Sequence, residues 1–346
     1  MLQKKHLEYR EKIRAFMEEK IQPIAATLDL EQRFPDEHMQ PLTEMGMFSM
    51  LVPEEYGGRP VDTVSYSIAV EEASRVCGST GIMLAAHNSL GCFPILYFGN
   101  DDQKKKYLPR AANGELLAFG LSEPDAGSDA GGTRTMARRE DNHWIINGSK
   151  CWITSATKAF ATIASARTSE DPEDKRITCF ILEKDTEGYS VGKKENKLGL
   201  RGSDTAFLHF DDLKVPQEAQ LGEIGQGFKQ MLITLDGGRI SIGAMALGLG
   251  QGAFECALKY AGERTQFGKP ISYNQAIQHR LADMATELEA ARQLIYEASF
   301  MKDAGVPFGH YSAMAKLYAS EVGTRACANA VLPSPAVTTR KPLRSR

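Results

Sequence analysis

Apolar side chains recur at helical spacing through the first third of the chain. The first stripe consists of Ile13, Phe16, Met17, Ile21 and Ile24. It predicts a helix over residues 7–31 with a bend near Pro23. Further helical patterns cover residues 35–47, 63–76, 82–90 and 104–108. Residues 1–115 are therefore expected to form an all-helical domain.

After residue 115 the pattern changes to short apolar runs separated by turn-forming residues. Residues 144–146 and 150–153 flank Asn147 and Gly148, a pair that tolerates the positive φ angles of a tight hairpin turn. Further strands are predicted over residues 177–182 and 206–210, after a charged loop at 169–175. Residues 116–222 are expected to form a β domain.

Helical patterns return after residue 222, and the first of them is rich in glycine. Each glycine costs up to about 1 kcal/mol of helix propensity, so close approach of a backbone or a ligand is the expected compensation. Within residues 228–263 these glycines include Gly237, Gly238, Gly243, Gly248, Gly250 and Gly252. From Ile277 to Ala298 apolar residues step alternately by four and three, as in a packed bundle, and a third helix is predicted over residues 310–330.

Length and composition fit a protein of several domains with a large core. The chain has 346 residues, of which 42% are hydrophobic and 25% charged. A net charge of -3 without a sustained basic face argues against nucleic acid or an anionic membrane as the main partner. The apolar run at residues 240–254 is too short and glycine-rich for a membrane span, and no secretory signal is visible. A soluble intracellular protein is expected.

The six cysteines are far apart, with no paired spacing. This pattern favours buried free thiols over disulfides or a metal site. Residues 331–346 contain three prolines and four basic residues but no acidic or aromatic residue, and we expect a disordered tail there.

The candidate chemistry lies in the middle of the chain. The turn Glu-Pro-Asp-Ala-Gly-Ser at residues 123–128 leaves backbone N–H groups unpaired, and Gly127 allows an anion to approach closely. Trp152 offers a flat apolar face, and the hydroxyls of Ser122 and Thr154 offer hydrogen-bond donors. An anion site beside an aromatic platform suits a dinucleotide such as FAD. A plain surface loop beside a core tryptophan is the alternative.

Four segments together resemble the acyl-CoA dehydrogenases, in that family's order and spacing. They are residues 121–129 (LSEPDAGSD), 147–154 (NGSKCWIT), 198–204 (LGLRGSD) and 264–270 (RTQFGKP). The resemblance covers about residues 7–330. It implies an α+β multidomain fold, with an all-α N-terminal domain (1–115), a β-barrel or sandwich middle domain (116–222) and an incomplete α-helical bundle (223–330), followed by the tail at 331–346.

The resemblance also implies which residues bind the cofactor and the substrate. The residues implied for FAD are Phe119, Leu121, Ser122, Gly127, Ser128, Trp152, Ile153, Thr154, Arg264, Gln266, Phe267 and Gln275, the last four reaching the FAD of a neighbouring subunit. Ser128, Asp236 and Arg239 are implied near the CoA thioester. A surface arginine at 264 and an intrahelical ion pair between Asp236 and Arg239 are the alternatives. No metal ligand is expected.

The implied function is α,β-dehydrogenation of a short- to medium-chain acyl-CoA to trans-2-enoyl-CoA in fatty acid β-oxidation. Electrons would pass to an electron-transfer flavoprotein. A homo-oligomer, a dimer or tetramer, is implied, located in the cytoplasm or, in a eukaryote, the mitochondrial matrix.

One feature departs from the family pattern. The usual base is a glutamate in a late Tyr-Glu-Gly-Thr-type segment, which these 346 residues do not contain. Some relatives place the glutamate immediately before the arginine of the Asp-x-x-Arg pair, and here that position is Gly238. Glu263 and Glu297 are expected on solvated faces, so no catalytic base is assigned. Loss of a positioned base typically costs about 10²- to 10⁴-fold in rate.

Two alternative functions therefore stay open. One is a catalytically inactive truncated product with residual FAD or CoA binding. The other is a flavin oxidase or monooxygenase on the same fold. The length of the acyl chain is not predicted, because each methylene discriminates by only about 1 to 3 kcal/mol.

Overall fold

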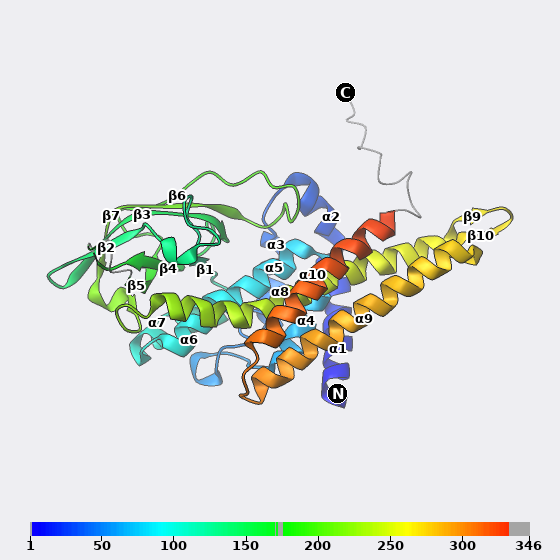
Figure 1. The fold of residues 1–346 in the computed structure, drawn as a ribbon, viewed down its shortest axis with the longest axis horizontal. Coiled ribbons are helices and arrows are strands. Elements are labelled where there is room, and N and C mark those ends of the chain that lie inside the picture. The colour runs from blue at the N-terminus through cyan, green and yellow to red at the C-terminus, as the bar shows by residue number, and fades with distance from the viewer. Residues whose placement is uncertain (1, 170, 172–175, 332–346) are drawn as a thin grey trace, which may run out of the picture. The chain divides into compact units, whose positions relative to one another are not determined.

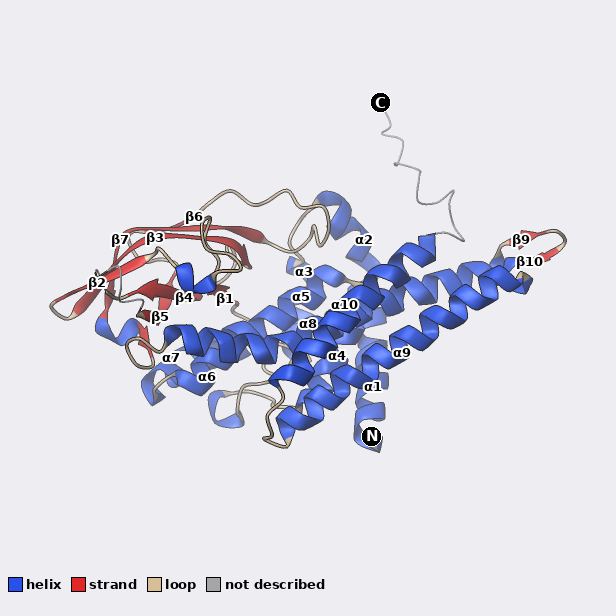
Figure 2. Ribbon diagram, viewed as in Figure 1, coloured by secondary structure: helices blue, strands red, loops and turns tan. Residues whose placement is uncertain are grey.

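The computed structural model describes residues 2–169, 171 and 176–331. All but the first residue of the predicted tail at 331–346, and most of the charged loop at 169–175, lie outside the described residues. Along the chain, helices come first, strands follow, and three long helices end the described part (Figures 1 and 2). This is the predicted order of a helical, a β and a helical domain.

The chain divides into two compact units that do not follow that order. The first unit, here the helix unit, comprises the described residues of 1–22, 62–81 and 239–346. The second, the sheet unit, comprises residues 23–61 and 82–238. The N-terminal helices are thus divided between the two units. The exact domain boundaries predicted above remain predictions.

The long helices of the helix unit come from three parts of the sequence. They are α1 (Lys4–Phe16), α4 (Thr63–Val76), the part of α8 (Gly227–Glu263) after Gly238, α9 (Gln275–Asp303) and α10 (Gly309–Val331). Helices α9 and α10 lie side by side (Figure 1). Six of the seven residues in the predicted seam of α9 are buried, because a 3.5-residue repeat places them on one face.

Glycines in α8 allow the backbones of other helices to approach closely. A Cβ atom at Gly248 would lie 2.2 Å from the carbonyl oxygen of Glu71 in α4, and one at Gly252 would lie 2.2 Å from that of Arg75. On another side of α8, a Cβ at Gly250 would lie 3.1 Å from the Cα of Gly323 in α10. The expected compensation for helical glycine is therefore present as helix packing.

Two buried carboxylates of α4 are each paired with arginine side chains in the helix unit. Glu71 accepts from Arg292 at 3.0 Å and from the hydroxyl of Tyr296 at 2.9 Å. Glu72 accepts from Arg14 at 3.0 Å and from Arg75 at 2.8 Å. Buried charges persist where they are paired in this way, so the cluster joins α1, α4 and α9.

A wider π-helical turn interrupts the first predicted helix just before Pro23. This turn, Met17–Ile21, separates α1 from α2 (Gln22–Glu31). Pro23 has no N–H to donate back to the preceding turn. The interruption therefore lies within a few residues of the position at which a bend was predicted.

In the sheet unit, short helices cover part of one sheet. The helical segments are α2, α3 (Asp36–Glu44), the end of α5 (Gly78–Ala86), the π-turn His87–Cys92, α6 (Phe93–Phe98) and α7 (Asp101–Ala112). Their core contacts with the sheet include Cys92, Ile95, Tyr107, Leu117, Ile163 and Ile181. This packing places the π-turn beside the first strand.

The sheet has eight strands. They are β1 (Leu117–Gly120), β2 (Met136–Glu140), β3 (His143–Thr154), β4 (Ala161–Arg167), β5 (Ile177–Glu183), β6 (Tyr189–Val191), β7 (Thr205–Pro216) and β8 (Gln220–Leu221). The order is β6-β7-β3-β2-β4-β5-β8, and β1 pairs in parallel with β4. The central antiparallel pair β3 and β7 carries two register shifts.

The predicted hairpin at Asn147 and Gly148 is wrong. Residues 143–154 form one continuous strand, and the hairpin turn lies between β2 and β3 at Asp141, whose φ is 50°. Gly148 instead has a φ of 144° within β3, where a Cβ would lie 2.7 Å from the Cα of Thr135. The Asn147 amide donates to Asp212 of β7 at 2.9 Å, beside the first register shift. Asn147 therefore lies opposite two residues of β7, Asp211 and Asp212, in a β-bulge where Asp212 has a φ of 44°.

Two predictions about burial also need correction. The six cysteines are free, but Cys256 and Cys327 are exposed rather than buried. The apolar run at 240–254 is part of the 37-residue helix α8, and this helix is long enough to cross a membrane. By length and composition alone, α8 and the stretch Gly78–Phe98 could cross a membrane, but 50% and 61% of their most apolar windows are buried inside the protein. Buried core helices have the same character.

Candidate functional site

A cavity of about 200 Å³ lies in the sheet unit where β1, β3 and α8 meet the π-turn. It is lined by six of the residues predicted for FAD: Phe119, Leu121, Ser122, Trp152, Ile153 and Thr154. It is also lined by residues that the sequence did not indicate: Ala86, Leu90, Ala118, Cys151 and Leu235. These are small or apolar residues on separate elements, and their convergence gives no sequence signal. The first two motifs thus form one cavity.

Trp152 is turned outward by a bulge in β3. Cys151 and Trp152 together lie opposite the single residue Phe207, because the register shifts between Lys150 and Ile153. Trp152 has a φ of 62° and a side chain that is 62% exposed, and its ring meets that of Phe207 edge-on at 5.4 Å. A left-handed φ in a bulky residue costs on the order of 1–3 kcal/mol and persists only where the surrounding structure enforces it. The bulge therefore presents an aromatic face to the cavity.

A buried ion pair joins the first motif to the second. Lys150 is fully buried, and its Nζ lies 2.7 Å from Oε1 of Glu123 and 3.0 Å from the hydroxyl of Ser165. The Glu123 carboxylate also accepts the backbone N–H of Arg134 at 2.7 Å. Burial alone would raise the pKa of Glu123, but Lys150 and the N–H donors outweigh it and hold that pKa below its usual value. The sequence showed both residues but not that they meet.

The third motif supports the end of the second. The buried Asp204 accepts the N–H of Thr157 on its Oδ2 at 2.7 Å, and its backbone oxygen accepts the N–H of Ser155 at 2.8 Å. Ser155 has a φ of 63°. Asp204 therefore fixes the turn that follows Thr154.

The turn predicted to bind an anion is formed, but residues 123–128 are not among the described residues that line the cavity. Glu123 and Ala126 exchange backbone hydrogen bonds of 3.0 and 3.1 Å, which close the turn. Gly127 and Ser128 are exposed, and a Cβ at Gly127 would meet nothing within 4 Å. Open space and backbone donors fit an anion. Asp125 beside them is paired with Arg134 at 2.7 Å, so its charge is partly compensated.

The other residues predicted for FAD lie in the helix unit. Arg264, Gln266 and Phe267 belong to a small hairpin of β9 (Thr265–Gln266) and β10 (Lys269–Pro270), and Gln275 begins α9. All four are exposed, Phe267 to 93%. None of the four is among the described residues that line the cavity, and their role toward a neighbouring subunit stays a prediction.

The predicted substrate and base positions are dispersed. Asp236 and Arg239 are half-buried on α8, and both have interaction partners. Glu263 and Glu297 are exposed, as expected. Gly238 is buried, and a Cβ there would lie 3.1 Å from the Cδ2 of Leu90, which lines the cavity. Among the described lining residues of the cavity there is no carboxylate.

The residues present fit the ring end of a flavin. The cavity has an aromatic face from Trp152, hydroxyls from Ser122 and Thr154, and apolar walls, which match a flat ring with a polar edge. Its volume suits a ring system rather than a whole dinucleotide, so the remainder of FAD would extend toward the open turn at Gly127 or beyond this chain. Within the described ranges, no group of three or more His, Cys, Asp and Glu could hold a metal ion.

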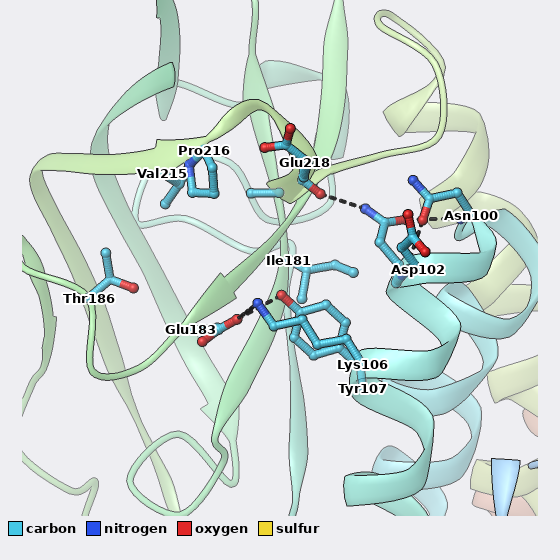
Figure 3. Close-up of a pocket in the computed structure, with 12 residues that line it drawn as sticks. Asn100, Asp102, Lys106, Tyr107, Ile181, Glu183, Thr186, Val215, Pro216 and Glu218 are labelled. Atoms are coloured by element: carbon cyan, nitrogen blue, oxygen red, sulfur yellow. Dashed lines mark hydrogen bonds and ion pairs between the residues drawn. The ribbon is translucent and has the colours of Figure 1, made fainter. Parts of the chain in front are cut away.

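A second cavity of about 280 Å³ lies in the sheet unit beside the start of α7. Lys106 and the hydroxyl of Tyr107 both reach Glu183 of β5, at 2.6 and 2.9 Å (Figure 3). Burial alone would raise the pKa of Glu183, but these two donors hold it below its usual value. No residue predicted for FAD or substrate is among the described residues that line this cavity.

Family models cover nearly the whole chain. The acyl-CoA dehydrogenase N-terminal, middle and C-terminal domains match residues 3–115, 118–213 and 225–332. A probable acyl-CoA dehydrogenase of Bacillus subtilis is 47% identical over 93% of this chain and 85% of its own length. The mitochondrial short-chain specific acyl-CoA dehydrogenase of Mus musculus is 47% identical over 92% of this chain and 78% of its own.

Solved structures give the same result. Butyryl-CoA dehydrogenase from Megasphaera elsdenii has a TM-score of 0.94 at 39% identity, covering 98% of this chain and 90% of that one. A glutaryl-CoA dehydrogenase from Mycobacterium smegmatis in complex with FADH2 has a TM-score of 0.92 at 29% identity, covering 98% and 86%. A chain from a structure described as the electron transferring flavoprotein of Acidaminococcus fermentans has a TM-score of 0.94 at 41% identity, covering 97% and 89%. With the cavity formed by its first two motifs, this chain belongs to the acyl-CoA dehydrogenase family of flavoprotein oxidoreductases, which act on CH–CH groups in fatty acid β-oxidation.

Proposed function

We propose that the chain is an FAD-dependent dehydrogenase of short acyl-CoA thioesters, which forms trans-2-enoyl-CoA. The observation that carries the proposal is the cavity in which Phe119 and Ser122 of the first motif meet Trp152 and Thr154 of the second. The names of the similar mouse and Megasphaera elsdenii enzymes support a short acyl chain. The complex of the Mycobacterium smegmatis relative with FADH2 supports FAD.

The residues of the cavity would bind and orient the reacting groups. A bound flavin would accept the hydride that leaves the β-carbon, since no side chain accepts hydride. Trp152 would cover one side of the ring, and the hydroxyls of Ser122 and Thr154 would donate to its polar edge. Ala86, Leu90 and Leu235 would exclude water. Ser128, Asp236 and Arg239 remain proposed contacts of the CoA thioester.

The exposed hairpin supports a homo-oligomer. Arg264, Gln266, Phe267 and Gln275 would bind the FAD of a neighbouring subunit, the Arg264 guanidinium beside its pyrophosphate. An electron-transfer flavoprotein as acceptor is supported by the structural similarity to the Acidaminococcus fermentans chain. A cytoplasmic or mitochondrial location is supported by the bacterial and mitochondrial relatives.

We further infer that this 346-residue polypeptide removes the α-proton slowly. The described lining of the cavity has no carboxylate, and Glu263 and Glu297 are exposed. A positioned base contributes about 10²- to 10⁴-fold, so binding is expected to survive better than turnover.

Flavin absorbance tests the main proposal. The purified protein should show flavin absorbance or acquire it from added FAD, and butyryl-CoA added without oxygen should slowly bleach it. Colourless protein that takes up no FAD would favour an inactive product. Rapid reoxidation by oxygen, faster than by an electron-transfer flavoprotein, would favour an oxidase or monooxygenase.

Gly238→Glu tests the inference about the base. The new side chain meets the flexible end of Leu90 rather than a backbone, and glutamate is a better helix former than glycine. Bleaching by butyryl-CoA should accelerate by about 10²-fold or more. Gly238→Gln is the matched control and should bring no gain. Fast bleaching by the unmodified protein, or equal rates in both variants, would contradict the inference.

A further inference from the structure

We propose that Glu123 and Asp204 are positioning residues that hold the segment 150–157 from both ends, so that Trp152 and Thr154 face the cavity. This assignment gives a structural role to the third motif, residues 198–204. It rests on the proposed function, because the orientation of Trp152 and Thr154 matters only if a flavin binds in the cavity. The two residues come from different motifs and contact different ends of the same segment.

Glu123 fixes the upstream end. Its carboxylate binds Lys150, whose Nζ also lies 3.3 Å from the carbonyl oxygen of Leu121. The N–H of Cys151 donates to the carbonyl oxygen of Ser122 at 2.9 Å. Both residues before Trp152 are therefore tied to the first motif, one by its side chain and one by its backbone. Neither can shift along β7 without leaving a buried charge or donor unpaired.

Asp204 fixes the downstream end. It accepts the N–H groups of Ser155 and Thr157 through its backbone and its carboxylate. Because Asp204 directly precedes β7, and Thr154 pairs with Thr205, these bonds also set the register at which β3 ends. The turn 155–157 is thereby attached to β7, the strand that carries Phe207, whose ring meets the Trp152 ring edge-on.

Between the two attachments lies a segment that ordinary pairing would not produce. Trp152 and Ser155 both have left-handed φ angles, 62° and 63°, without being glycine. A slip of one residue would remove the bulge and reverse the side chains after it. Cys151 and Ser155, the two attached residues nearest to Trp152, are four residues apart. Their hydrogen bonds prevent that slip, so the exposed position of Trp152 can persist.

Trp152 itself can report on the proposal. The chain has two tryptophans, and Trp144→Phe leaves Trp152 alone. The indole N–H of Trp144 is buried without a hydrogen-bond partner among the described residues, so phenylalanine loses no hydrogen bond there. In this background, acrylamide quenching and fluorescence anisotropy of Trp152 are measured without FAD, followed by the Kd of FAD and the thermal midpoint.

Glu123→Gln and Asp204→Ala should each release the segment. The quenching constant should rise at least about twofold, the anisotropy should fall, and the Kd of FAD should rise about tenfold, which is about 1.4 kcal/mol. Asp204→Asn keeps an acceptor for Thr157 and should stay near the parent values. Glu71→Gln is the control for lost stability, because it breaks a buried ion pair in the helix unit. It should lower the thermal midpoint and leave Trp152 quenching and the Kd unchanged.

The double variant Glu123→Gln/Lys150→Met covers the case in which Glu123→Gln does not fold. It removes the unpaired charge together with the attachment, so it should fold and still release Trp152. Parent-like quenching in the double variant and in Asp204→Ala would overturn the proposal. So would an equal change in Glu71→Gln, since general loss of stability would then explain the effect. If the Trp144→Phe parent itself binds no FAD, the proposed function fails, while the quenching series still decides the positioning role.

Discussion

His87 is a buried histidine that connects three segments of the sheet unit. Its Nε2 lies 3.1 Å from the carbonyl oxygen of Phe48, and its Nδ1 accepts the N–H of Leu117 at 3.2 Å. These partners require a neutral ring that carries its proton on Nε2. Burial lowers the pKa of His87 to about 4, against the backbone hydrogen bonds that raise it. Because Leu117 begins β1, the neutral ring fixes the strand that leads into the cavity.

The neutral histidine should make stability depend on pH. An unfolded histidine has a pKa of about 6.5, so below that pH the unfolded chain binds a proton that the native protein refuses. The native pKa is the lower one, and the free energy of unfolding therefore falls as the pH falls from about 6.5 toward 4, by up to about 1.4 kcal/mol per pH unit. Urea titrations across this range measure the slope.

His87→Gln should remove that part of the slope, whatever it does to stability at neutral pH. His279→Gln is the control, because His279 is exposed on α9. An unchanged slope in His87→Gln would contradict the prediction.

The residues that line the cavity were partly predictable from the sequence. Trp152, Ser122 and Thr154 stand out because an aromatic ring and hydroxyls at these positions have an evident chemical use. Glu123, Lys150 and Asp204 do not, because a charged residue in a turn usually faces water. Their burial follows from strand register and from segments more than twenty residues apart, which local spacing does not contain.

The glycines of α8 have different roles that the structure separates. Gly248 faces the backbone of α4, whereas a Cβ at Gly262, near the end of the same helix, would meet nothing within 4 Å. Gly248 thus permits close helix packing, whereas Gly262 lowers the helix propensity of α8 without any packing that requires a glycine.

Alanine at these two positions should have opposite effects. Gly248→Ala places a Cβ 2.2 Å from the carbonyl oxygen of Glu71 and should lower the free energy of unfolding by about 1–3 kcal/mol, since helices must separate. Gly262→Ala should raise it by about 0.5–1 kcal/mol through helix propensity. Urea unfolding measures both. Equal signs for the two variants would show that backbone packing at Gly248 is not tight.

Helices were predicted more accurately than strand connections. The repeat of four and three in α9 depends only on which side of one helix is buried, and it gave the helix within a few residues. The prediction of a hairpin at Asn147 and Gly148 failed because Asn-Gly suits both a tight turn and an irregularity within a strand, and only the partner strand distinguishes them. The register of β3 on β7, and with it the outward turn of Trp152, could not be read from spacing.

Across the whole chain, the order of helical, β and helical domains was predictable from periodicity, but the division into compact units was not. Helices α1 and α4 come from the first part of the sequence but belong to the same compact unit as α8, α9 and α10. Glu71 of α4 pairs with Arg292 of α9, and Glu72 pairs with Arg14 of α1. Two adjacent glutamates on a helix normally indicate a solvated face. Their burial depends on arginines from distant segments.

Binding of FAD should stabilise the whole protein against heat. A ligand that binds the native state adds about 2.7 kcal/mol at one hundred times its Kd, so the thermal midpoint should rise with FAD concentration. Trp152→Ala removes the exposed ring of the cavity and should reduce this rise, while the midpoint without FAD stays close to the parent. A midpoint independent of FAD would contradict binding in the cavity.

Two of the six cysteines are exposed and four are buried, one of them in the cavity wall. The rates at which their thiols are modified can therefore report whether the cavity opens. A chromogenic thiol reagent should modify Cys256 first in the native protein. Cys327 should follow more slowly, because its side chain, although exposed, is partly desolvated by its surroundings, and this raises its pKa. The other four should react only as the protein unfolds. Since Cys151 lines the cavity, early modification of a third thiol at that position would reveal transient opening of the cavity wall long before the fold is lost.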